Sequence, residues 1–281
     1  VKEKAKPKTS SGGKVAPGSL RKSMGMTVFE NRTVYALVNF QETLRDYLAG
    51  AFQRNCSGLI IMKDDDEKYP SDFEKLPRLS SGSIDSFKLC EMGRKLGLTA
   101  VMTGSITDIK TSDESRGILL WKGSYPAVSL TVHVNVIDTE TGTKLLDESF
   151  THKKYSDEIE MESIKSGKIE PAFLKEAFEH IAGEAGKKVY EIIRRESWKG
   201  YISSVSGDKV TISSGSNTGV ATGKAFEVFG NSLIVGMQGQ RFLVPGVKTG
   251  EVKITGVFDD SAEALIVSGD SIKEGYTVRA K

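Results

Sequence analysis

The spacing of apolar residues along the chain changes at about residue 198. Before that point, segments with apolar residues at helical spacing alternate with short apolar stretches. Beyond it, only short stretches with a period of two remain, separated by glycine-rich turns. The first pattern predicts helices packed against a mixed sheet, and the second predicts a small all-β unit. We therefore expect an α+β protein with one domain over residues 23–198 and a second over residues 199–281.

Three segments of the first domain show the apolar stripes of amphipathic helices. They cover residues 38–55, residues 83–98 and residues 171–196. Ser83 is the expected N-cap of the second helix, with Asp85 in its first turn and Gly97 at its end. Pro171 suits the first turn of the third helix. The stripes comprise Leu44, Leu48, Ala51 and Phe52, then Leu89, Met92 and Leu96, then Leu174, Phe178, Ile181, Ala185, Val189 and Ile192.

The other apolar stretches of the first domain predict strands. They cover residues 24–29, 58–63, 99–109, 128–136 and 145–154. Within residues 128–136, Val and Leu alternate with Ser, Thr, His and Asn, which indicates an antiparallel strand with one solvated face. The polar sequence DTETG, residues 138–142, predicts the turn into the next strand.

The second domain contains seven short stretches with strand character in about eighty residues. They are GYISSV, DKVTIS, KAFEVF, RFLVP, GEVKITGVF, AEALIV and GYTVRAK. Glycine-rich turns separate them, as tight turns and barrel corners require. This pattern predicts a small β-barrel or sandwich.

The stretch GSNTGVATGKAFEVF, residues 215–229, is the nearest approach to an enzymatic motif. A phosphate-binding loop needs four residues between its first glycine and its Gly-Lys pair, followed by Ser or Thr and a helix. Here Gly219 stands one residue too close to Gly223 and Lys224, Ala225 has no hydroxyl, and the following residues alternate like a strand. We therefore predict that the two glycines shape a turn and that Lys224 is a solvated side chain.

Composition narrows the class of protein. The chain has 281 residues, a formal net charge of +2, 38% hydrophobic and 27% charged residues, which is typical of a globular protein rather than of a nucleic-acid or membrane-surface binder. No run of about 18 apolar residues is present. Residues 1–22, rich in Lys, Pro, Ser and Gly, predict a flexible basic tether, or an end segment without a function of its own. Because the chain begins with Val1, we expect that an upstream piece such as a signal peptide was removed.

Candidate chemistry is sparse. Cys56 and Cys90 are the only cysteines, and they form either a disulfide, in an oxidising compartment, or two buried thiols. The acidic run 64–67 is a solvated face or a cation site, but it lacks calcium-loop spacing. We predict no catalytic, cofactor-binding or metal-binding residues. The alternative is a hydrolase that uses Asp108, Asp138 or the acidic run.

One segment is too apolar for an idle loop. Residues 116–130, RGILLWKGSYPAVSL, contain three consecutive aliphatic residues and two aromatic ones. Tyr and Trp are enriched at interface hot spots. We predict that Leu119, Trp121 and Tyr125 bind a partner. The alternative is that Trp121 caps the core of its own domain.

Three short motifs of the first domain follow one another in a familiar order. A strand runs into F-x-N-x-T, a later segment has L-G followed by G-x-I, and another strand runs into D-x-x-T-G. The matching residues are Phe29, Asn31, Thr33, Leu96, Gly97, Gly104, Ile106, Asp138, Thr141 and Gly142. This order resembles the TolB amino-terminal-like domain, which the CsgG family and the middle of the FlgT family share. The resemblance covers about residues 20–197 and implies an α/β sandwich with a mixed sheet.

The second domain resembles the carboxy-terminal domain of FlgT-like proteins, which is an SH3-like barrel. The pattern is carried by Gly200, Val205, Gly207, Val210, Ile212, Gly215, Gly219, Val220, Gly223, Phe226 and Val228. Both resemblances imply a non-enzymatic assembly or scaffold protein of the periplasm, which could be an outer-membrane lipoprotein of a Gram-negative bacterium. The implied partners are envelope or flagellar basal-body proteins or further copies of the chain, with no nucleic acid and no membrane contact except an N-terminal lipid anchor. The alternative is a CsgG-like secretion or curli-assembly lipoprotein, which would need longer membrane hairpins.

Overall fold

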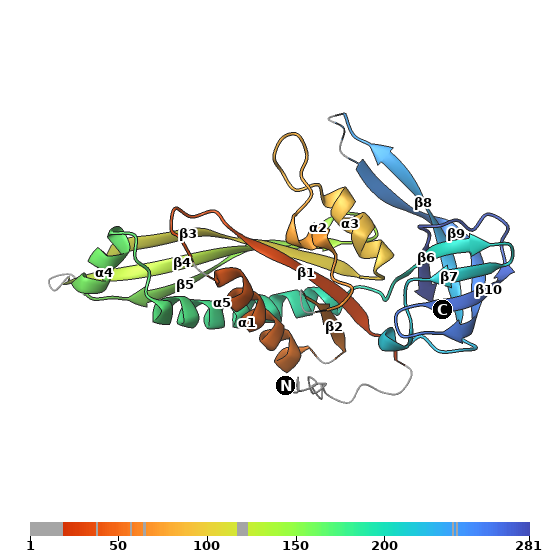
Figure 1. Ribbon diagram of the computed structural model, residues 1–281, viewed down its shortest axis with the longest axis horizontal. Helices are drawn as coiled ribbons and strands as arrows, with labels where there is room; N and C mark the ends of the chain where they lie inside the picture. Colours follow the sequence, from red (N-terminus) through yellow and green to blue (C-terminus); the bar gives the residue numbers. More distant parts are fainter. Residues whose placement is uncertain are drawn as a thin grey trace, which may run out of the picture.

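The computed structural model describes residues 19–37, 39–56, 58–63, 66–116, 123–237, 239 and 241–281. The molecule is elongated, with a long sheet and its helices at one end and a barrel at the other (Figure 1). Five strands form the sheet in the order β2-β1-β3-β4-β5. Their bounds are β1 Lys22–Asn31, β2 Leu59–Met62, β3 Ala100–Arg116, β4 Gly123–Asp138 and β5 Lys144–Tyr155.

The sheet is mixed, as the sequence predicts. Strand β1 runs parallel to both β2 and β3, and the β3–β4 and β4–β5 pairs are antiparallel. In β4, the predicted alternation is confirmed, because every second residue from Val128 to Val136 is buried while His133 and Asn135 are only partly covered. Together with the second, antiparallel sheet of the barrel, this mixed sheet makes the protein α+β.

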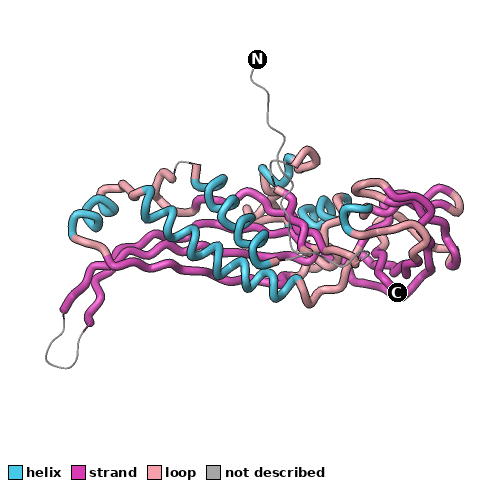
Figure 2. Tube along the Cα trace, turned by 90° about the horizontal axis from the view of Figure 1, so that it is seen from below, coloured by secondary structure: helices cyan, strands magenta, loops and turns pink. Residues whose placement is uncertain are grey.

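Helices cover both faces of the sheet. The helices are α1 Phe40–Asn55, α2 Ser71–Glu74, α3 Ser86–Lys95, α4 Glu158–Lys165 and α5 Pro171–Ile193. Helices α1 and α5 lie side by side along one face (Figure 2), where Leu44, Phe178 and Met102 share one core. Because neighbouring residues of a strand point to opposite faces, Val101 belongs to a separate cluster under α2 and α3 that contains Leu89.

Two helix predictions need correction. Helix α3 begins at Ser86, and its N-cap is Asp85, whose side chain accepts a hydrogen bond from the Lys88 backbone, so Ser83 lies before the helix. The most buried ends of the α5 stripe are Phe173 and Ile193. The predicted Leu174 and Ile192 are only partly buried. The middle of the stripe, from Phe178 to Val189, is confirmed, and the buried residue at each end lies one position further out than predicted.

The second half of the chain closes into a barrel with the strand order β10-β7-β6-β11-β8-β9. The strands are β6 Gly200–Ser206, β7 Lys209–Ile212, β8 Ala225–Val235, β9 Arg241–Val257, β10 Ala262–Ser268 and β11 Thr277–Ala280. The expected small β-barrel is present, with six strands instead of seven. RFLVP and GEVKITGVF belong to the single strand β9, because the backbone stays extended through residues 245–250.

The glycine-rich stretch before β8 is a turn. Gly219 and Gly223 both have positive φ angles, 82° and 85°, and the stretch leads into a strand rather than a helix. Lys224 is half-buried, and its Nζ donates to the Gly219 carbonyl at 3.2 Å, so it is not the solvated side chain that the sequence suggested.

Candidate functional site

The sheet contacts the barrel through the turn between β4 and β5. Three successive residues of this turn, Asp138, Thr139 and Glu140, are almost completely buried. Lys199 Nζ lies 2.6 Å from Asp138 Oδ1 and 3.2 Å from Glu140 Oε2, and Arg279 Nη2 lies 2.7 Å from Glu140 Oε1. We call this turn, with the barrel residues that bind it, the joint.

Hydrogen bonds to hydroxyl and backbone groups complete the joint. Thr139 Oγ1 donates to a backbone carbonyl, so the phenol of Tyr201, 2.8 Å away, must be the donor in their mutual hydrogen bond. Arg94 Nη1 donates to the Thr139 carbonyl at 2.7 Å, and Ser213 Oγ donates to the Arg94 carbonyl at 3.0 Å. The end of α3, the turn and the barrel therefore hold one another directly.

Burial and neighbouring charges set the pKa values of Tyr201 and Lys199 in the joint. Burial raises the pKa of Tyr201 well above its usual range, so its hydroxyl stays protonated. Burial alone would lower the pKa of Lys199, but the attraction of Asp138 and Glu140 and its hydrogen bonds to them more than offset that effect, and the net pKa is raised. Lys199 therefore remains a cation at physiological pH.

These contacts account for Asp138, one of the residues that the hydrolase alternative proposes. Asp138 is bound by Lys199 and also accepts hydrogen bonds from the backbone and hydroxyl of Thr141. Asp108 lies elsewhere, on β3, where it forms an ion pair with Lys110. The structure does not bring the two carboxylates together, and Asp138 is an element of the joint.

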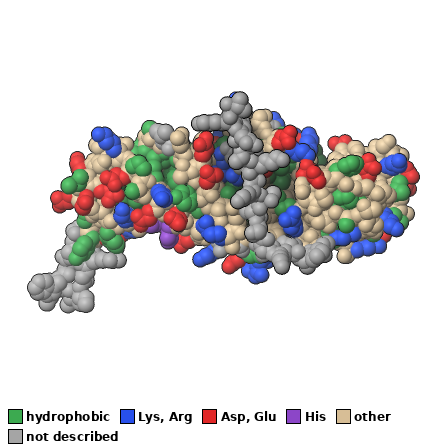
Figure 3. All heavy atoms as spheres, turned by 60° about the horizontal axis from the view of Figure 1, so that its bottom comes forward, with side chains coloured by type: hydrophobic (Ala, Val, Ile, Leu, Met, Phe, Trp, Pro, Cys, Tyr) green, Lys and Arg blue, Asp and Glu red, His purple; other side chains and the backbone are tan. Residues whose placement is uncertain are grey.

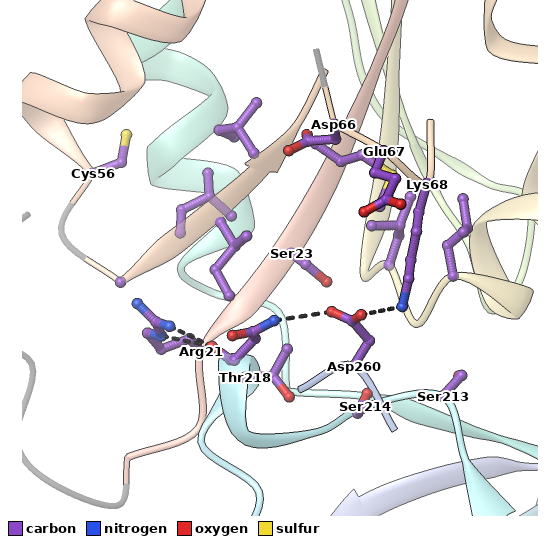
Figure 4. Close-up of a pocket in the computed structure, with 18 of the residues that line it drawn as sticks. Arg21, Ser23, Cys56, Asp66, Glu67, Lys68, Ser213, Ser214, Thr218 and Asp260 are labelled. Atoms are coloured by element: carbon purple, nitrogen blue, oxygen red, sulfur yellow. Dashed lines mark hydrogen bonds and ion pairs between the residues drawn. The ribbon is translucent and has the colours of Figure 1, made fainter. Parts of the chain in front are cut away.

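A groove lies beside the joint, between the sheet and the barrel (Figure 4), with a volume of about 700 Å³. One wall is the strand β2, all four residues of which line the groove. The opposite wall belongs to the barrel. It consists of Ser213, Ser214, Asn217, Thr218 and Asp260.

The strand wall has a free edge. Strand β2 stands at the end of the sheet and pairs, within the described part of the chain, with β1 alone. Its apolar side chains are half-exposed along the groove. Among the described residues, the Leu59 N–H donates to the Cys56 carbonyl at 3.3 Å, and the other backbone N–H and C=O groups on the side away from β1 remain available to another strand.

The barrel wall is polar and carries its charges in pairs. Lys68, from the loop after β2, forms an ion pair with Asp260, which also accepts a hydrogen bond from Asn217 Nδ2 at 2.9 Å. The hydrogen bond from Lys68 is the main reason that the pKa of Asp260 is lowered. Arg21 Nε donates to the Asn217 carbonyl at 3.1 Å (Figure 4). The paired charges fix the width of the groove on this side.

One buried polar atom beside the groove has no partner among the described residues. The Ser214 side chain is almost wholly buried, at 2% exposure, and its Oγ makes no hydrogen bond with any described residue. Buried hydroxyls without a partner are rare, since the lost hydration costs about 1–3 kcal/mol. The Oγ packs beside Gly97 and Gly200, where an added Cβ would lie 3.2 Å from it, and it is closed off from the groove.

The cysteines are not reactive groups of this groove. Cys56 and Cys90 are free and buried, so the alternative of two buried thiols is confirmed and the disulfide is not formed. Burial raises the pKa of each thiol to about 12. Cys56 lines the groove, yet it remains a neutral thiol rather than a thiolate nucleophile.

A second hollow lies on the polar face of the sheet, where His133, Asn135 and Glu30 are among its lining residues. Its charges are mutually satisfied, because Arg32 and Arg78 both bind Glu30 and His133 Nε2 lies 2.7 Å from Asp147. It has no free strand edge, so the groove beside β2 is the stronger candidate.

Of the predicted partner-binding residues, Tyr125 lies at the far end of the sheet from this groove (Figure 1). Tyr125 is described and is 50% exposed near the tip of the β3–β4 hairpin. Leu119 and Trp121 lie outside the described residues. Of the acidic run 64–67, Asp66 and Glu67 are described and line the groove, and Asp66 Oδ2 accepts a hydrogen bond from the Lys63 backbone.

Three further features of the described residues bear on the function. On the face shown in Figure 3, acidic and basic side chains are interspersed, without a single-sign stretch. In the described ranges, no three or more His, Cys, Asp or Glu side chains are grouped as metal ligands would be. No described helix has the length and apolar character to cross a bilayer.

No protein-family model matches the chain, and no curated protein matches it. It is similar to the solved structure of the hypothetical protein CT253 from Chlamydia trachomatis, with a TM-score of 0.39 and 13% identity over 63% of this chain and 99% of that one. It is also similar to the structure of lipoprotein GNA1162 from Neisseria meningitidis, with a TM-score of 0.34 and 15% identity over 62% of this chain and 99% of that one. The structure of the PelC dodecamer from Paraburkholderia phytofirmans matches with a TM-score of 0.32 and 12% identity over 62% of this chain and 91% of that one. These similar structures include a bacterial lipoprotein, but at such low TM-scores they give no information about the groove.

Proposed function

We propose that the protein is a non-enzymatic assembly or scaffold protein of the bacterial cell envelope that holds an extended segment of a partner protein in the groove. The single observation that carries this proposal is the free edge of β2 along the groove wall. The sequence resemblance to FlgT-like proteins supports a periplasmic location, with or without an outer-membrane lipid anchor. It also supports a TolB amino-terminal-like fold for the sheet, an SH3-like fold for the barrel, and envelope or flagellar basal-body proteins as partners.

The chemistry of the groove suits an extended peptide. A strand added to a sheet edge gains main-chain hydrogen bonds, while pockets for alternate side chains give specificity. Here the wall formed by β2 is apolar, and the barrel wall carries polar residues with hydroxyl, amide and carboxylate groups. A partner strand with alternating apolar and polar side chains would match both walls.

Proline substitutions test the edge directly. Successive N–H groups of a strand point to opposite sides, so of Ile60 and Ile61 one donates toward β1 and the other toward the groove. Ile60→Pro and Ile61→Pro should therefore differ. One should lower the melting temperature by breaking the pairing with β1, and the other should leave it nearly unchanged but block partner binding.

Binding is measured by site-specific photo-crosslinking in cells that produce the protein. A photoreactive amino acid at Gln53 or Glu67, both exposed groove residues, should capture a defined envelope protein. The same group at Glu179, exposed on α5, is the control and should not capture it. If the folded proline variant keeps full crosslinking, or if the control position captures the same protein, the groove does not hold the partner.

A further inference from the structure

Strands β8 and β9 continue beyond the barrel as a two-stranded ribbon that projects from it (Figure 1). Strand β11 pairs with β8 only up to Phe229, and β10 pairs with β9 only from Glu251. Between these limits the two strands pair with each other, for example Ile234 with Phe242. We call residues 231–237 and 241–247 the arm.

The arm is apolar on both faces. Its sequence carries one charged residue, Arg241, in these fourteen positions. Residues opposite each other share a face, so Ile234 and Phe242 lie on one face while Leu233 and Val235 lie on the other. A solvated hairpin would alternate apolar with polar residues, and this missing alternation is a sequence signal that the prediction of seven short strands overlooked.

The exposed area is that of an interface. Seven apolar side chains of the arm have exposed fractions from 43% for Val244 to 106% for Met237: Leu233, Ile234, Val235, Met237, Phe242, Val244 and Val247. They expose on the order of 700 Å² in all, more than the ~300–600 Å² of the largest patch on a typical monomer. An exposed apolar surface of this size marks an interaction site.

The arm is held in place for binding. Arg241 lies over the Phe87 ring at 4.4 Å from its centroid, and its Nη2 is 3.5 Å from Asp85 Oδ2 at the start of α3. The only charge of the arm is thus directed back to its own chain. Its orientation is fixed without a partner, which lowers the entropy cost of association.

A lipid bilayer does not suit the arm. Beyond the barrel, both outer edges of the ribbon lack strand partners among the described residues, and hydrocarbon cannot satisfy their N–H and C=O groups. A two-stranded ribbon is also marginal by itself, whereas three or more strands form a stable sheet. The occupant must therefore supply both apolar surface and backbone groups.

We propose that the arm binds the arm of a second copy of this chain. An apolar ribbon whose single charge is bound to its own chain is complementary to itself, as a two-fold symmetric interface requires, and two arms side by side pair a free edge of each. The two ribbons then become one four-stranded sheet, in which apolar side chains of the two adjoining strands contact each other on both faces. This interface is independent of the groove beside β2.

Sedimentation equilibrium of the full chain tests the proposal. The wild type should approach twice the 30.6 kDa of one chain at micromolar concentration. Ile234→Glu and Phe242→Glu place like charges at the interface and should raise the dissociation constant by about 30-fold or more, the effect of a hot spot. Both sites are about half exposed, so the variants should keep the wild-type melting temperature. Ile159→Glu, at an 82% exposed site on α4, is the matched control and should leave the dissociation constant unchanged.

Three results would overturn the proposal. They are a monomeric wild type up to about 100 μM, equal dissociation constants for wild type and arm variants, and an effect of the control as large as theirs. Flotation with phosphatidylethanolamine–phosphatidylglycerol vesicles tests whether the arm binds lipid instead. If the wild type binds these vesicles and the arm variants do not, the arm binds lipid and the self-association proposal is rejected. Crosslinking from Gln53 or Glu67 in the same variants reports on the groove separately, so failure of one proposal is distinguishable from failure of the other.

Discussion

Lys199 of the barrel lies 2.6 Å from Asp138 of the sheet, with both side chains about 95% buried. Neither charge has access to bulk water, so each depends on the other. We expect Lys199→Met to destabilise the protein by about 3–5 kcal/mol, because it leaves Asp138 buried without its counter-charge. Urea unfolding measures the loss.

Lys144 supplies the control for this pair. It forms an ion pair with Asp147 at 2.6 Å, but its side chain is 57% exposed. Lys144→Ala should change the free energy of unfolding by less than about 0.5 kcal/mol. The double variant Lys199→Met/Asp138→Leu should recover part of the loss of Lys199→Met, since no charge of this pair then stays buried alone. Equal losses for Lys199→Met and Lys144→Ala would show that the joint is not a stabilising contact.

Gly97 fits where no other residue can. Its φ is +67°, and a Cβ there would lie 1.6 Å from the Ser213 carbonyl oxygen of the barrel. Gly142 also has a positive φ, +77°, but a Cβ would meet nothing within 4 Å. Gly142→Ala should therefore cost only the ~1–2 kcal/mol of the backbone conformation, and Gly97→Ala clearly more. Thermal unfolding of the two variants compares them, and equal losses would contradict the packing of α3 on the barrel.

His152 gives the protein a stability that falls in acid. Burial lowers its pKa below 6.5, and His180, with ring centroids 5.0 Å apart, lowers it further, against the opposing attraction of Glu176. The unfolded chain then binds more protons than the folded one below about pH 6.5, so stability decreases as pH falls through this range. We expect the melting temperature to drop less between pH 7 and pH 5 in His152→Gln than in the wild type. Identical pH profiles would exclude this role for His152.

The sequence could predict elements whose signal is local. The stripe of α1 and the alternation of β4 are confirmed, because burial of one face imposes its period on the residues themselves. The turn after β1 follows from Asn31, whose side chain accepts from the Thr33 backbone and donates to the Tyr35 carbonyl. Pro171 marked the start of α5 for a similar reason, since its missing N–H costs nothing there.

The candidate site could not be predicted in the same way. The groove joins β2 to barrel residues such as Ser214 and Asp260, which lie more than 150 positions later in the chain. In the joint, Asp138 meets Lys199 across 61 positions, and no period or motif encodes that meeting. Gly104 shows the limit of a motif: the sequence identified the residue, but only the fold shows that a Cβ there would lie 2.1 Å from the Phe29 ring.

The hairpin between β3 and β4 stays a proposed second docking surface. Tyr125 is half-exposed, and Trp121 is the predicted anchor of the same sequence segment. If Trp121 binds a partner, Trp121→Ala should leave the melting temperature nearly unchanged and weaken association. If it belongs to the core, the variant should lose roughly 3–5 kcal/mol of stability with association intact. Thermal unfolding and sedimentation of this one variant distinguish the two outcomes.

Trp198 decides where an independent barrel unit would begin. The predicted boundary falls between Trp198 and Lys199, yet the Trp198 ring packs in the barrel core, 5.2 Å from the Phe226 ring. We therefore expect a fragment of residues 197–281 to fold alone. A fragment of residues 200–281 should be less stable by roughly 3–5 kcal/mol, the usual cost of removing a large buried aromatic side chain.

Near-ultraviolet circular dichroism and urea unfolding of both fragments measure this difference. Lys199 and Arg279 do not complicate the comparison, because without the sheet their charges are free to reach water rather than being buried against Asp138 and Glu140. Trp198→Ala in the longer fragment is the matched variant, and it should reproduce the loss seen on shortening. A barrel that unfolds equally with and without Trp198 would place the boundary after this residue, and a longer fragment that fails to fold would show that the barrel requires the sheet.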